Sequence, residues 1–231
     1  MKIELSEPKL HRLLPAYSLT GDLLSFLRCG LQYRFHSGSK LPPSRPVQFW
    51  FGDFIHGVME RAFLLWKKNN HEFPWPYSKT VDGLPDIESD SLAINDITRV
   101  GHIVETYLRT LGKSARSIVV RQFGYERANT AINQLGPILF PLISKAEEAV
   151  IGTRMLNTGN GNNKKYELHG VVDVLTEIEL KAGKSDNAIV RFVSEKLEID
   201  RGVFEVIVDY KGARRPSLKE EYWEQHKRQI S

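Results

Sequence analysis

The chain has 231 residues, of which 41% are hydrophobic and 10% aromatic, and this length and composition allow one sizeable buried core. Lys and Arg number 32 against 28 Asp and Glu, and the resulting formal charge of +4 is compatible with a polyanionic partner and equally with an ordinary solvated surface. The single cysteine excludes an internal disulfide and a cluster held by several cysteines of this chain, and without any run near the roughly 18 apolar residues of a membrane span we expect a cytoplasmic protein outside the membrane.

Helical spacing of apolar side chains dominates the N-terminal part of the sequence. The pattern predicts three amphipathic helices, over residues 20–31, 51–66 and 97–111. Residues 72–90 are rich in Pro, Asp, Ser and Gly, which predicts a loop. More helix is expected up to about Lys145, with a break near Gly136 and Pro137. We therefore expect a helical region over about residues 18–145.

The composition then changes to that of a sheet. Residues 166–175 and 203–210 are short, β-branched and aromatic, which predicts two strands. A weaker strand at 148–156 is expected to form a hairpin with the first of them across the Asn- and Gly-rich turn at 157–165.

The remaining segments complete an expected α/β fold. The polar connection 176–202 is expected to carry one more strand at 189–193, and Ser217–Ser231 is expected to form a final helix. Together these elements predict a small mixed central sheet with flanking helices and a helical N-terminal region. The expected organisation is a single domain over residues 1–231, with the sheet and final helix in about 146–231.

Asp209-Tyr-Lys211 is the sharpest local motif of the sequence. Residues two apart in a strand point to the same face, so the Asp209 carboxylate and the Lys211 ammonium are expected side by side. The alternative is a surface ion pair on an edge strand, worth well under about 1 kcal/mol. The largely apolar run 205–208 before the pair favours a functional site, because burying two charges costs free energy.

Asp173 is the second candidate metal ligand. It follows Gly170-Val-Val in the other main strand, and Gly170 leaves room for close approach of a backbone or a substrate. If the two strands pair, Asp173 and Asp209 can converge on one cation. Two carboxylates are hard oxygen ligands suited to Mg²⁺ or Mn²⁺.

His56 is the third candidate ligand, on the helix expected at 51–66. Gly52 lies one turn before it and Glu60 one turn after it, on the same face. An imidazole nitrogen beside two carboxylates favours Mn²⁺ over Mg²⁺. Glu60 is a candidate partner for the other ring nitrogen of His56, and a solvated helix charge is the alternative.

These motifs follow one another in a fixed order, as Gly52-Asp-Phe-Ile-His56, Gly170-Val-Val-Asp173, Asp209-Tyr-Lys211 and Gln229. In order and spacing they resemble the signature of RecB-like nucleases in the PD-(D/E)XK superfamily, whose core is restriction-endonuclease-like. The resemblance implies that Mg²⁺ or Mn²⁺ is bound by His56, Asp173 and Asp209. It also implies that Lys211 orients and activates the attacking water, and that Gln229 on the following helix contacts the site.

The activity implied by the resemblance is metal-dependent hydrolysis of DNA phosphodiester bonds. Similar domains occur at the ends of helicases in double-strand-break processing and as exonucleases in CRISPR adaptation. We therefore expect an exonuclease-like enzyme of DNA repair, recombination or CRISPR-type DNA processing, with DNA and a helicase subunit or domain as partners. The alternative is a catalytically inactive DNA-binding or scaffold module of a helicase-nuclease assembly.

Cys29 lies in a stretch, Leu27-Arg-Cys-Gly-Leu-Gln-Tyr33, that is similar to the Cys-Pro-x-x-aromatic stretch of many members, with Gly30 in place of the proline. In iron-sulfur members this cysteine joins three more near the C-terminus, and the family's tyrosine four residues after the glutamine would fall beyond Ser231. We therefore expect a chain truncated at its C-terminus, with Cys29 an iron-sulfur ligand only in a longer chain. The alternative role for Cys29 is that of a small buried residue.

Overall fold

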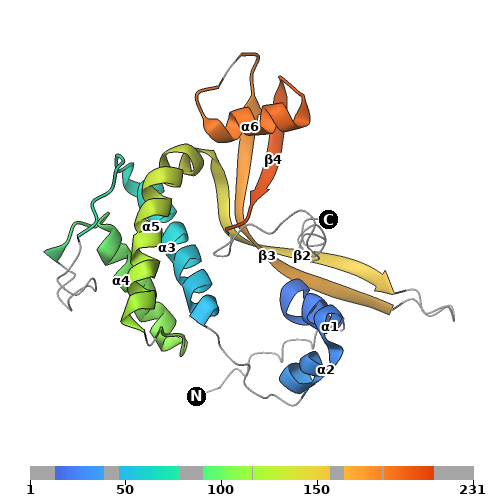
Figure 1. The fold of residues 1–231 in the computed structure, drawn as a ribbon. Coiled ribbons are helices and arrows are strands. Elements are labelled where there is room, and N and C mark those ends of the chain that lie inside the picture. Colours follow the sequence, from blue (N-terminus) through green and yellow to red (C-terminus); the bar gives the residue numbers. More distant parts are fainter. Residues whose placement is uncertain are drawn as a thin grey trace, which may run out of the picture. The chain divides into compact units, whose positions relative to one another are not determined.

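The computed structural model describes residues 14–38, 47–78, 91–115, 117–156, 164–183 and 185–210. Within them the fold is mixed α/β, with six α-helices and a four-stranded mixed sheet (Figure 1). The chain divides into two compact units, one formed by Met1–Pro43, Ala149–Val171 and Pro216–Ser231 and the other by Ser44–Glu148 and Val172–Arg215. The expected α/β class is confirmed, whereas the restriction-endonuclease-like core and the single-domain organisation stay predictions.

Three long helices of the second unit pack on one another, namely α3 (Val47–Asn69), α4 (Ile97–Thr110) and α5 (Ile118–Leu139) (Figure 1). Their apolar faces meet in the main core, where Phe54, Val100 and Ile132 are fully buried. α4 begins where the Asp96 carboxylate accepts a hydrogen bond of 2.8 Å from the Thr98 N–H, which satisfies a free donor of the first turn. The helices expected at 51–66 and 97–111 are confirmed.

The end of α5 differs from the expectation. The helix continues through Gly136 and Pro137 to Leu139, a short 3₁₀ turn follows at Phe140–Leu142, and a strand starts at Ile143. The further helix expected after residue 111 is confirmed by α5, whereas the expected break at Gly136 and Pro137 and the expected end at about Lys145 are wrong. Gly136 is buried so tightly that a side chain there would meet the Phe73 ring at 2.6 Å, and this core packing holds the last helical turn in spite of the proline.

Strand β3 (Lys164–Leu180) is the neighbour of all the other described strands, β1 (Ala16–Ser18), β2 (Ile143–Leu156) and β4 (Gly202–Val208). β1 runs parallel to β3, whereas β4 runs antiparallel to it with Val174 opposite Val208. The strands expected at 148–156, 166–175 and 203–210 are confirmed. The β3–β4 register leads directly to Asp173 and Asp209, the residues that come next on each side.

The strand expected at 189–193 is wrong, because this segment lies in helix α6 (Ala188–Leu197). The Asn187 side chain accepts hydrogen bonds from the N–H groups of Ile189 and Val190, which starts the helix. Ile189, Val190 and Val193 then pack on a second small core with Ile178 and Leu180 of β3. This segment contains several β-branched residues and is nevertheless helical, because Asn187 caps its start and its apolar side chains recur with the 3.6-residue period of a helix.

The first unit contains the segment expected to form one helix at 20–31. It consists instead of two short helices, α1 (Ser25–Arg28) and α2 (Gly30–Tyr33), with π-helical turns at Leu19–Leu24 and Arg34–Gly38. Cys29 is extended, with φ of −159°, and separates α1 from α2. Leu27 and Leu31 are exposed, so the amphipathic face lacks the burial that would stabilise one continuous helix.

Other expected segments are described only in part. Residues 72–78 of the expected loop contain neither helix nor strand, and residues 79–90 lie outside the described part. The final helix expected at Ser217–Ser231 also lies outside the described residues. Among the helices that are described, none is long and apolar enough to span a bilayer.

Candidate metal centre

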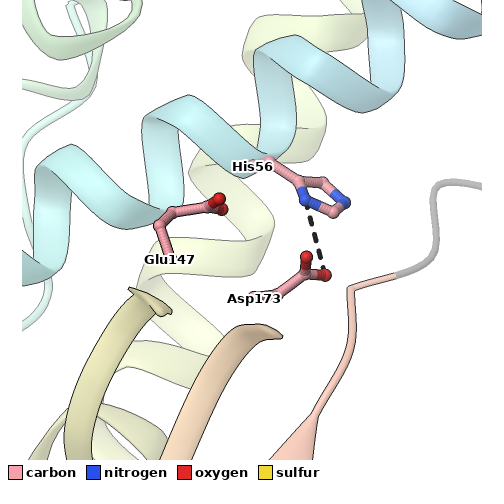
Figure 2. A group of neighbouring side chains, drawn as sticks. All are labelled: His56, Glu147 and Asp173. Carbon is pink, nitrogen blue, oxygen red and sulfur yellow. Dashed lines mark ion pairs between the residues drawn. The ribbon is translucent and has the colours of Figure 1, made fainter. Parts of the chain in front are cut away.

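Three side chains of the second unit come together from three different elements: His56 of α3, Glu147 of β2 and Asp173 of β3. One ring nitrogen of the histidine and one oxygen of each carboxylate all lie within 4.8 Å of one another. Figure 2 shows the three side chains pointing toward a common space. Two ligands bound on opposite sides of one cation are separated by about 4 to 5 Å, twice a bond of roughly 2.0 to 2.6 Å, so the spacing fits a metal ion.

The core packing of α3 sets the position of His56. Phe54, Val58 and Ala62 are fully buried and fix the helix against α4 and α5. His56 lies beside this face, with 28% of its side chain exposed, and its ring is directed at Asp173, whose side chain is 16% exposed. The imidazole is therefore held by a rigid element while remaining accessible from solvent.

The two ring nitrogens of His56 have different partners. Nε2 lies 2.8 Å from the backbone carbonyl oxygen of Tyr210, and Nδ1 lies 3.4 Å from Oδ2 of Asp173 (Figure 2). The hydrogen bond to Asp173 raises the pKa of His56 above its usual value, although burial acts in the opposite direction. Nδ1 thus faces a carboxylate that favours a positive charge between the two, either a proton on the ring or a metal ion.

Asp173 is held by the chain that follows β4. The N–H of Tyr210 donates a hydrogen bond of 3.0 Å to Oδ2 of Asp173. Burial alone would raise the pKa of Asp173, but hydrogen bonds with His56 and Asp209 lower it below the usual range. Asp173 is therefore ionised at neutral pH, as a metal ligand must be.

Asp209 is exposed and follows β4, and its carboxyl group is hydrogen-bonded to that of Asp173. The structure thus places Asp209 next to the cluster, as a third carboxylate beside the imidazole of His56 and the carboxylates of Glu147 and Asp173. The roles expected for His56, Asp173 and Asp209 as ligands stay predictions.

Glu147 is the member of the cluster that the sequence analysis missed. Its backbone is left-handed, with φ of 50°, within a strand of extended residues, and this turn of the chain costs about 1 kcal/mol or more for a residue other than glycine. Burial raises the pKa of its carboxyl group, and the nearby negative charges of Asp173 and Glu60 raise it further. Such crowding of carboxylates is unfavourable without a cation, which makes Glu147 a strong candidate ligand.

No local motif distinguishes Glu147 from its neighbour Glu148. The sequence shows two adjacent glutamates, and the structure gives them different surroundings, because Glu148 forms a surface ion pair of 2.7 Å with Lys145. The feature that could have identified Glu147 is its position near the start of β2, the strand that pairs with β3, which carries Asp173. That feature becomes usable only when the pairing and the bend at residue 147 are known.

The other expected site residues are placed as follows. Glu60 lines the hollow beside the cluster, but the second ring nitrogen of His56 is held by the Tyr210 carbonyl and not by Glu60. Cys29 is exposed in the first unit, so the alternative of a small buried residue is wrong. Lys211 and Gln229 lie outside the described residues.

The cluster lines a shallow hollow that is too narrow in this structure to enclose a water molecule. The apolar side chains of Met59, Phe63 and Val174 form part of its lining, next to the polar ones of the cluster. One nitrogen and several carboxylate oxygens make a donor set for Mn²⁺ or Mg²⁺, with further positions left for water and phosphate oxygens. The donor set therefore suits a divalent cation.

In comparisons with known proteins, no family model, no curated protein and no solved structure matches this chain.

Proposed function

We propose that this chain is a metal-dependent deoxyribonuclease, which hydrolyses DNA phosphodiester bonds at a Mn²⁺ or Mg²⁺ site formed by His56, Glu147, Asp173 and Asp209. The observation that carries the proposal is the convergence of a ring nitrogen of His56 with the carboxylates of Glu147 and Asp173 from three separate elements. The resemblance of the motif order to RecB-like nucleases supports the choice of reaction. The formal charge of +4 is in keeping with a polyanionic substrate.

The residues divide the chemistry between them. A bound divalent cation would polarise the phosphodiester and lower the pKa of a bound water. His56, Glu147, Asp173 and Asp209 would hold and orient that cation. Lys211, two residues after Asp209, would position the water or stabilise the charge that develops on phosphorus. Gln229 would contact the site from the segment that follows, as the resemblance implies.

The donor set also supports a preference between the two metals. A site formed by oxygen ligands alone would suit Mg²⁺. The imidazole of His56 adds a nitrogen donor, which suits Mn²⁺ better. We therefore propose that Mn²⁺ supports faster cleavage than Mg²⁺ at equal concentration. By the same resemblance, the biological setting proposed is DNA repair, recombination or CRISPR-type processing, with a helicase subunit or domain as the partner.

The test is a cleavage assay of the full chain on end-labelled single-stranded and double-stranded DNA, with Mn²⁺, with Mg²⁺ and with EDTA. The proposal predicts products with either metal, more of them with Mn²⁺, and none with EDTA. Cleavage that persists in EDTA would contradict the metal site. Binding of DNA without any cleavage would favour the inactive DNA-binding or scaffold module.

A further inference from the structure

The excess positive charge of the chain belongs to the first unit. The three segments of that unit contain 12 Lys and Arg against 7 Asp and Glu, a net charge of +5, whereas the rest of the chain has 20 against 21, a net charge of −1. The candidate metal centre lies in the second unit, so this charge is separate from it. Positive charge concentrated in the smaller part of a protein indicates a surface for a polyanion.

The carboxylates in the described part of the first unit are occupied within that unit. Asp22 accepts hydrogen bonds from the Ser18 N–H at 2.7 Å and from the Tyr33 hydroxyl at 2.9 Å, and Glu167 lies 2.9 Å from Nε2 of His169. The basic side chains there are instead exposed, and they are Arg28, Arg34, Arg154, Lys164 and Lys165. The described part of this unit therefore presents cations to solvent.

Exposed aromatic rings lie in the same stretch of chain as two of these cations. Phe26 in α1 and Phe35, just after α2, are 57% and 49% exposed, and Arg28 and Arg34 lie between them in the sequence. Aromatic rings stack on the bases of single-stranded nucleic acids, while guanidinium groups bind the phosphates. The combination of rings and arginines within residues 26–35 matches both parts of such a ligand.

The ring of Phe26 is held in one position although much of it faces solvent. It lies against the start of α2, where a Cβ added at Gly30 would meet the ring at 3.3 Å. The Tyr33 ring packs on it edge to face, with the ring centres 5.8 Å apart and the planes at 87°. The hydrogen bond from Tyr33 to Asp22 fixes that second ring in turn. A ring held in this way loses little conformational entropy when a base stacks on it.

We propose that Phe26, Arg28, Arg34 and Phe35, here called the α1–α2 surface, bind single-stranded DNA, with Phe26 as a platform on which a base stacks. A duplex would offer its phosphates but not its base faces, so the surface prefers a single strand. The exposed Leu27 would also suit a protein partner, but the net charge of +5 in this unit favours a polyanion. The inference concerns binding alone and does not require the metal centre.

The first test measures binding of the unaltered protein in EDTA, where a metal-dependent enzyme leaves DNA intact. The probe is fluorescently labelled oligothymidine of about 16 nucleotides, compared by fluorescence anisotropy with an abasic strand of equal length and with the same strand in a duplex. We expect the oligothymidine to bind most tightly, because only it offers free base faces. Equal affinity for the abasic strand would contradict stacking, and no binding of any probe would overturn the inference in favour of a protein partner.

The second test places the stacked base at Phe26. Phe26→Ala is expected to weaken binding of oligothymidine by about 5- to 100-fold, and binding of the abasic strand much less. Phe192→Ala is the matched control, since Phe192 is 58% exposed and lies in the second unit, and it should bind both strands as the unaltered protein does. If the two folded variants bind oligothymidine equally well, the α1–α2 surface is not the binding site.

The third test concerns the two arginines and stands even if Phe26→Ala fails to fold. The double variant Arg28→Ala and Arg34→Ala should reduce the slope of log affinity against log salt concentration by about 1.4, since each phosphate contact on a single strand adds about 0.7. Arg109→Ala with Arg201→Ala removes two exposed arginines of the second unit and should leave the slope unchanged. Equal slopes for the two double variants would contradict the inference.

These tests separate the inference from the proposed nuclease function. Binding of oligothymidine that depends on Phe26 and Arg28, without cleavage in Mn²⁺, would keep the α1–α2 surface and refute the nuclease. Cleavage in Mn²⁺ by a protein whose DNA affinity does not change in these variants would keep the nuclease and refute the surface.

Discussion

Nδ1 of His56 lies 3.4 Å from Oδ2 of Asp173, so a proton and a metal ion compete for the same space. The hydrogen bond to Asp173 raises the pKa of His56, and the protonated ring cannot bind metal. We expect the affinity for Mn²⁺ to rise with pH, by up to about tenfold per pH unit below the raised pKa, and to level off above it.

The measurement is calorimetric titration with Mn²⁺ between about pH 6 and pH 9, a range that includes the ordinary imidazole pKa. His56→Gln is the control, because it removes the titrating ring and should flatten much of the dependence. An affinity of the unaltered chain that does not change with pH would place His56 outside the metal site.

Glu147 and Glu148 form a natural pair for comparison. Glu147→Gln is expected to weaken Mn²⁺ binding by at least about tenfold, because it replaces a charged ligand with a neutral one. The same change should raise the melting temperature of the metal-free protein, since the pKa of Glu147 is raised by burial and by like charges, and the ionised group destabilises the fold above that pKa.

Glu148→Gln is the matched control, since Glu148 lies next in sequence and forms only a surface ion pair with Lys145. It should leave both the Mn²⁺ affinity and the melting temperature nearly unchanged. If the two variants behave alike, Glu147 is not a ligand.

Two helix glycines are expected to respond in opposite directions to alanine. At Gly52, one turn before His56, no described atom lies within 4 Å of an added Cβ, so Gly52→Ala should stabilise the protein by about 0.5 to 1 kcal/mol through helix propensity. At Gly101, the added Cβ would lie 2.4 Å from the Tyr125 ring, so Gly101→Ala should destabilise it by about 1 to 3 kcal/mol. Denaturant unfolding measures both, and a stabilising Gly101→Ala would show that the packing of α4 on α5 is described incorrectly.

The ion pair between Glu105 and Arg121 joins α4 to α5. Arg121 donates to both carboxylate oxygens of Glu105, and the Tyr125 hydroxyl donates to one of them at 3.0 Å. The Glu105 side chain is only 4% exposed, so Arg121→Ala would leave a buried carboxylate without its cation. We expect a loss of about 3 kcal/mol in the free energy of unfolding at neutral pH. Denaturant unfolding of this variant and of Arg127→Ala, a nearby substitution in the same helix, should differ by most of that amount; equal stabilities would contradict the account.

Much of the helical part could be predicted from the sequence, because burial follows the local spacing there. In α4, Ile97, Val100, Val104 and Leu108 recur every three or four residues, and all four are buried. The segment Ile189–Val193 was misassigned because its β-branched residues favour a strand in isolation. Its packing against Ile178 and Leu180, which lie elsewhere in the sequence, decides for the helix.

From the sequence, only the candidate site residues that belong to recognisable motifs could be predicted. His56, Asp173 and Asp209 stand in recognisable patterns, and the β3–β4 register brings the last two to adjacent positions. Glu147 stands in no pattern, because its direction depends on a left-handed φ and on the pairing of its strand. The contribution of Tyr210 comes from its backbone, which no side-chain motif can report.

The most direct test of the central claim is the Mn²⁺-dependent rate of DNA cleavage by Asp173→Asn, measured beside the unaltered chain and Glu148→Gln in identical preparations. Asp173 contacts His56 and the Tyr210 N–H and adjoins Asp209, so its charge is required for any cation held there. The account predicts a loss of cleavage of at least about 100-fold in Asp173→Asn, or about 2.7 kcal/mol in the barrier, with normal cleavage by Glu148→Gln. Equal cleavage by all three proteins would contradict a nuclease site at Asp173.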